Sequence, residues 1–206
     1  MNGQDLAAEL RDDHETPFSR LGSSKALYAL TGGEMDAAPV RAAAADDARS
    51  LASVLDDWVG DEDDDDVASL FEELAETARD HASSVAPDDH ESGDAPEMDA
   101  ELAGFSDTKP RLGGLLARYL VTLKHVEQMV GFFVGDADPR TASEFRDLRG
   151  DIEDARDRVA ATLDELCDED DDWANASRAA DAVVEVAYDD YVETLESMGV
   201  KPKNVC

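Results

Sequence analysis

The stretch from Val67 to Ala86 constrains the fold most, because it reads as one long amphipathic helix. Apolar residues recur along it at the three- and four-residue spacing of a single helix face: Val67, Leu70, Phe71, Leu74, Ala78, Ala82 and Val85. Most of the other positions carry charged or small polar side chains. Such a helix is stable in water only when other elements cover its apolar face. The chain must therefore build a core of several packed elements around it.

The same spacing predicts the other elements. Four further long segments show it, and we expect each to be a helix: residues 39–59, 112–134, 141–166 and 173–198. A short apolar patch at residues 183–186 falls inside a helical period and does not indicate a strand. The predicted fold class is all-α, an antiparallel bundle of four to five helices.

We expect one domain, since 206 residues can enclose a single sizeable core. Its predicted parts follow in chain order: an N-terminal helical cap at 1–33, a first helix pair at 39–86, a crossover at 87–110, a second helical half at 111–198 and a tail at 199–206. The crossover is rich in Pro, Gly, Asp and Ser, which is typical of a connection. A connection of this length lets the helix after it run parallel to the helix before it.

The charge is extreme: 51 acidic residues against 18 basic ones give a formal net charge of −33. This disfavours nucleic acid as a partner. Carboxylates cover every predicted helix face, which resembles the proteins of salt-in halophiles, where molar salt screens charge repulsion. We also expect no signal peptide, no membrane span and a cytoplasmic setting. The two cysteines, Cys167 and Cys206, predict reduced thiols.

Two polar residues fall on predicted apolar faces and are the candidate site residues. His81 lies on the inward side of the 67–86 helix, and Glu127 lies on the stripe of the 112–134 helix. A histidine hydrogen-bonded to a neighbouring helix would explain the first, and pairing with Lys124 or an arginine would explain the second. Metal ligation is the alternative for both. His125, two positions from Glu127, is expected to face elsewhere.

The segment VASLFEELAETARDHASSV resembles the second helix of rubrerythrin-like members of the ferritin-like superfamily, where an ExxH pair supplies two ligands to a di-iron site. The resemblance implies two helix pairs joined by a long crossover. It places His81 at the histidine position, Glu127 at a carboxylate position, and Asp46 or Asp47 at the first-helix carboxylate. Ala78 stands where the family has glutamate, and the 141–166 helix has no ExxH. Asp46, His81 and Glu127 could then hold a single iron or zinc ion.

A second resemblance points to another class of protein. The phrase SSKALYAL, residues 23–30, is similar to an early helix of NusB-type transcription antitermination factors, which are all-helical and bind RNA. Those proteins carry arginines before this motif, whereas here Arg20 and Lys25 flank it in an acidic chain.

The sequence thus favours a non-catalytic, ferritin-like bundle without a complete metal site, which binds or regulates a protein partner or forms a homodimer. The alternatives are a rubrerythrin-type redox protein using iron or zinc, and an RNA-binding antitermination factor.

Overall fold

The computed structural model describes residues 1–88 and 90–202, and its regular elements there are all helices. Three short helices come first: α1 Gly3–Asp13, α2 Glu15–Leu21 and α3 Ser24–Leu30. Five long helices and one short one follow: α4 Ala37–Asp61, α5 Asp65–Val85, α6 Glu97–Ala103, α7 Thr108–Gly135, α8 Pro139–Leu166 and α9 Asp170–Ser197. The predicted all-α class is confirmed. The end of the predicted tail, with Cys206, lies outside the described residues.

Helix ends follow local sequence signals. The chain breaks at His14 between α1 and α2, and Pro17 occupies the first turn of α2, where its missing N–H costs nothing. Asp64 caps α5 by accepting hydrogen bonds from the N–H groups of Asp66 and Val67. Pro139 stands at the start of α8, after an Asp138 cap.

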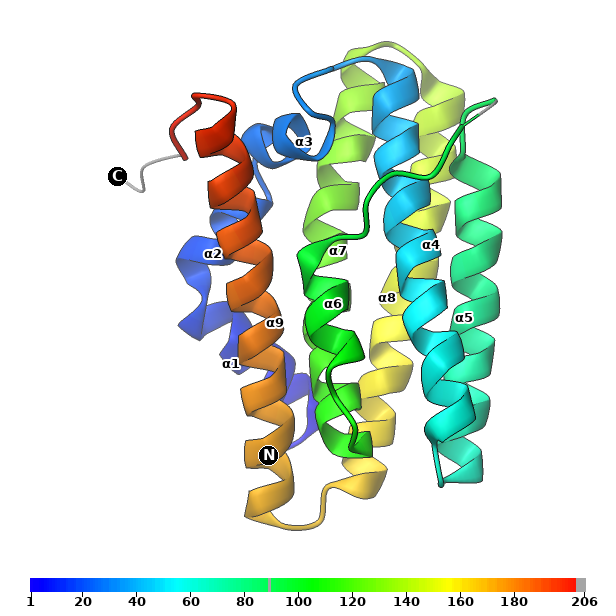
Figure 1. Cartoon of the computed structure of the whole chain (residues 1–206), viewed down its shortest axis with the longest axis vertical. Helices are drawn as coiled ribbons and strands as arrows, with labels where there is room; N and C mark the ends of the chain where they lie inside the picture. The colour runs from blue at the N-terminus through cyan, green and yellow to red at the C-terminus, as the bar shows by residue number, and fades with distance from the viewer. Residues whose placement is uncertain (89, 203–206) are drawn as a thin grey trace.

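The long helices pack side by side, with α4–α5 and α7–α8 as antiparallel pairs and α7–α9 as a parallel pair (Figure 1). Helices α5, α7 and α9 run in one direction, and α4 and α8 run in the other. α4 and α5 pair along their whole length, while α7 packs against both α8 and α9. The crossover from α5 returns the chain to the opposite end of the bundle, so that α7 runs parallel to α5, as its length predicted.

The crossover is more ordered than a simple connection. It contains α6, which packs against α9 and contacts α4 and α7. The residues expected at its end, 108–110, already belong to α7. Met98 and Leu102 bury one face of this short helix, which brings the intervening Asp99 into the interior.

α7 is the central helix, and nearly every residue from 111 to 126 is buried. It approaches α9 so closely that a Cβ on Gly113 would lie 2.2 Å from the backbone oxygen of Ala176. At its C-terminal end α7 leaves the core, and Val134, the last residue of the predicted 112–134 helix, is 54% exposed. A single apolar stripe is therefore the wrong description of this helix, because its neighbours surround it on almost all sides.

Candidate functional site

A buried arginine organises the centre of the bundle. Arg118, on α7, is 1% exposed, and all five of its N–H donors are used. Nε and Nη2 donate to the two carboxylate oxygens of Asp99, at 3.0 and 3.2 Å. Nη1 donates to Oδ2 of Asp47 at 2.9 Å and to Oγ1 of Thr122 at 2.6 Å, and Nη2 also donates to the backbone oxygen of Asp47 at 2.8 Å. We call Arg118, Asp47, Asp99 and Thr122 the polar cluster.

The polar cluster joins three helices of the bundle. Asp47 comes from α4, Asp99 from α6, and Arg118 and Thr122 from α7. Thr122 lies one turn after Arg118 on the same side of α7, which is why its hydroxyl reaches the guanidinium. The planar fork of arginine matches the carboxylate of Asp99 with two parallel hydrogen bonds. The cluster therefore fixes the crossover helix against the bundle.

The charges in the cluster are unequal, with one cation facing two carboxylates. Burial lowers the pKa of Arg118, but the charges of Asp47 and Asp99 outweigh it and hold that pKa above its ordinary value. Burial raises the pKa of Asp47, and Arg118 only partly reverses this because Asp99 repels the same negative charge. Asp47 thus takes up a proton more readily than an ordinary aspartate does.

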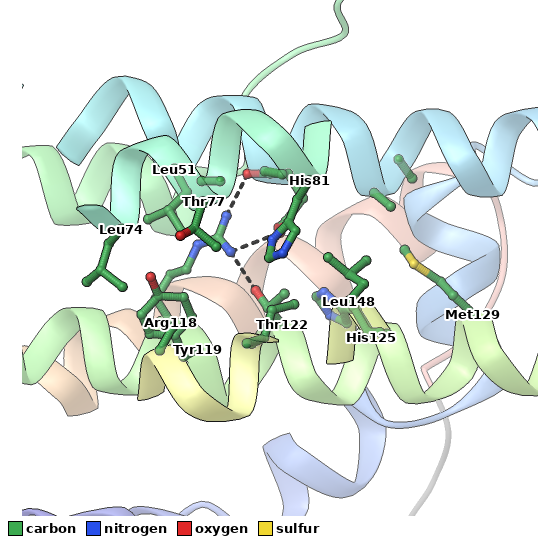
Figure 2. A pocket seen from close by; sticks show the side chains of 18 of the residues that line it. Leu51, Leu74, Thr77, His81, Arg118, Tyr119, Thr122, His125, Met129 and Leu148 are labelled. Atoms are coloured by element: carbon green, nitrogen blue, oxygen red, sulfur yellow. Dashed lines mark hydrogen bonds and ion pairs between the residues drawn. The ribbon is translucent and has the colours of Figure 1, made fainter. Parts of the chain in front are cut away.

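An inner cavity of about 40 Å³ lies beside the cluster, between the α4–α5 hairpin and the α7–α8 pair. Figure 2 shows His81 reaching into it from the hairpin, opposite Arg118, Thr122 and His125 of α7. Its remaining walls are mainly apolar, with Leu51, Leu74 and Leu148 among them. The volume suits a few water molecules at most.

His125 lines this cavity from α7. The residue is only 8% exposed, and none of the side-chain hydrogen bonds between described residues involves its ring. Burial, and then the charge of Arg118, lowers the pKa of His125 to about 4. The ring is therefore neutral at pH 7, with one nitrogen able to accept a hydrogen bond and the other able to donate one.

An outer cavity of about 510 Å³ adjoins the inner one. The two share Leu30, Ala43, Asp47 and His125 as lining residues. Helices α3, α4 and α9 and the segment 93–97 form its walls. Its apolar lining is of small and aliphatic residues: Leu21, Ala26, Ala29, Leu30, Ala43, Ala95, Pro96 and Ala187. A small molecule in this space would reach His125 at its inner end.

The polar lining of the outer cavity is acidic. Within the part of the chain that the structure describes, Asp94, Glu97 and Asp190 line it without an ion-pair partner. Burial, followed by repulsion from Glu97, raises the pKa of Asp190. Tyr191 adds a buried hydroxyl that has no hydrogen-bond partner among the residues that the structure describes. The cavity therefore combines negative charge with neutral groups that lack partners.

The three predicted metal ligands lie in different environments. His81 does face the interior, and its Nε2 lies 3.1 Å from Oδ2 of Asp151 on α8. Asp46 faces the crossover, where it contacts Arg49 and His90, each at 2.8 Å.

Glu127 is not on the buried face of α7. Its side chain is 42% exposed, and it contacts Lys124 at 3.2 Å. His125, expected to face elsewhere, takes the interior position, because the buried surface of α7 extends around most of the helix. In residues 1–88 and 90–202, no three His, Cys, Asp or Glu side chains are grouped closely enough to hold a metal ion. Metal binding by Asp46, His81 and Glu127 stays a prediction, with no clustering to support it.

Sequence reasoning missed Arg118, Asp99, His125 and Tyr191. One signal was present: Arg118 interrupts the otherwise apolar run LLARYLVTL. Asp99 gave no comparable signal, because it stands in an acidic connecting segment where one more aspartate is unremarkable in composition.

Comparison of the chain with protein-family models, with curated protein sequences and with solved structures finds no match in any of the three. The geometry of the polar cluster and the two cavities therefore carries the functional argument.

Proposed function

We propose that this protein is a non-catalytic binding protein that takes a small molecule into the outer cavity. The observation that carries the proposal is a space of about 510 Å³ lined by the buried Tyr191 hydroxyl, which has no hydrogen-bond partner among the described residues, and by the buried His125. Buried polar groups in proteins almost always have partners. A ligand in the cavity would provide the missing one, and cavities of this size are typical of small-molecule sites.

We further propose that the scaffold is ferritin-like. Arg118 would supply the positive charge that the metal ions supply in the rubrerythrin-like proteins that the sequence resembles. Two antiparallel pairs, α4–α5 and α7–α8, joined by a long crossover support this arrangement. Arg118 lies between the pairs and forms ion pairs with both Asp47 and Asp99. A carboxylate that is paired with a guanidinium gains little from a second cation. This is why we favour binding over rubrerythrin-type redox chemistry.

The acidic surface supports a salt-rich cytoplasm as the setting, and it gives RNA no basic surface to bind. None of the helices described is long and apolar enough to cross a membrane.

A fragment screen by ligand-observed NMR tests the proposal. The panel should contain cationic, neutral and anionic fragments, and each hit should be repeated on two variants. Ala43→Phe fills the wall common to both cavities, whereas Ala174→Phe places the same ring on an exposed position of α9. Fragments lost with Ala43→Phe and retained with Ala174→Phe support the proposal. If no fragment of any charge shows this pattern, the proposed function is wrong.

A further inference from the structure

We infer that the ligand is a small organic amine, bound as its ammonium ion with an apolar body. The inference rests on the proposed function and specifies the chemistry of the molecule. It starts from the charges of the outer cavity, where Asp94, Glu97 and Asp190 have no ion-pair partner among the described residues. In contrast, Asp46 and Asp47 at the same cavity are each paired with an arginine.

Asp190 is the carboxylate best placed to meet such a cation. It is half-buried on α9, one residue before Tyr191 and three after Ala187, which also line the cavity. Its only hydrogen bond among the described groups is a long one from Thr194, at 3.5 Å. Burial and the nearby Glu97 both disfavour its charge, as the raised pKa of Asp190 shows. A bound cation would remove that penalty.

Two buried neutral groups fit an amine as well. An ammonium group carries N–H donors and needs acceptors, which the neutral ring of His125 and the hydroxyl oxygen of Tyr191 can provide. An anion would instead face the carboxylates without any cationic lining residue to pair with, since Arg118 has no free donor.

A bare metal ion fits less well than an organic cation. The lining carboxylates do not form a group of three that could surround an ion within the described chain. Metal–oxygen bonds are only about 2.0–2.6 Å long, so a metal needs converging ligands. An amine needs only one or two carboxylates, and its hydrocarbon part can contact the alanine and leucine walls.

Isothermal titration calorimetry on the full chain tests the charge directly. Benzylamine, benzyl alcohol and benzoate share a ring and differ in charge. We expect benzylamine to bind tightest and to weaken about tenfold or more in Asp190→Asn, because a charged hydrogen bond is lost. Asp189→Asn is the matched control, since Asp189 is exposed and does not line the cavity. It should leave the affinity unchanged.

Benzylamine affinity should also fall as KCl is raised, because the carboxylates of the cavity are partly exposed. Equal or tighter binding of benzyl alcohol or benzoate overturns the amine inference and leaves the proposed function standing. Equal losses in Asp190→Asn and Asp189→Asn also overturn it. No binding by any of the three compounds, together with an empty fragment screen, refutes both proposals.

Discussion

Replacing Arg118 by methionine tests whether the polar cluster holds the bundle together. The variant leaves Asp47 and Asp99 without the guanidinium that they share, and it removes five hydrogen bonds. Breaking a buried ion pair from one side costs about 3–5 kcal/mol, because a charge stays buried without compensation. For a chain of this length the loss corresponds to a melting temperature lower by about 6–20 °C.

The pH dependence separates this cause from a simple packing defect. Without Arg118, nothing offsets the burial and the charge of Asp99 that raise the pKa of Asp47, so the folded-state pKa of Asp47 lies further above its unfolded value. A raised carboxyl pKa destabilises the fold increasingly as pH rises from the unfolded pKa toward the folded one. The cost of Arg118→Met, measured by urea unfolding, should therefore be larger at pH 8 than at pH 5.

Two further variants complete the test. Arg118→Lys keeps the charge but not the fork, so its cost should be intermediate. The triple variant Arg118→Met, Asp47→Leu, Asp99→Leu removes all the buried charge and should recover most of the lost stability. A cost below about 1 kcal/mol for Arg118→Met, or equal costs at the two pH values, would refute the reasoning.

Other predictions address single features. The pKa of His125, near 4 in the folded protein against 6.5, means that the unfolded state binds more protons between these values. The free energy of unfolding is therefore unaffected by His125 above pH 6.5 and falls as the pH is lowered, by about 2 kcal/mol at pH 5. In His125→Gln, the free energy of unfolding measured with urea should vary less between pH 4 and 6.5. Gly113→Ala should cost about 1–3 kcal/mol or more, because its Cβ meets the backbone of Ala176, whereas Gly131→Ala, with open space around it, should not destabilise. Asp190→Asn should raise the melting temperature of the free protein at pH 7 while weakening amine binding, since its pKa is raised in the fold. Elemental analysis of protein purified without chelators should find no stoichiometric iron or zinc, and one equivalent that is lost in His81→Ala would revive the redox alternative.

Most of the long helices could be predicted from the sequence because each is buried on one side only, which produces a single apolar stripe. On α9, the residues that recur at helical spacing, such as Val183, Tyr191 and Leu195, are all buried. Prediction failed on α7 for the opposite reason. A helix surrounded by neighbours has no polar face to indicate which of its sides is buried. Glu127 was therefore predicted inside and His125 outside, whereas the structure has His125 buried and Glu127 exposed. The hypothesis that Glu127 is a metal ligand depended on placing it on the buried side of α7.

The centre of the site depends on tertiary placement that periodicity does not encode. Asp99 becomes buried because Met98 and Leu102 anchor α6 against the bundle. Only then does it meet Arg118 of α7, which lies 19 residues further along the chain. The same placement closes one side of the outer cavity with residues 93–97. Loss of the Asp99–Arg118 contact would therefore both destabilise the fold and loosen a wall of the cavity. Asp99 holds a wall of the cavity, whereas Asp190 would meet the ammonium ion. Asp99→Asn, which keeps the shape of the side chain and removes its charge, should therefore weaken benzylamine binding less than Asp190→Asn does.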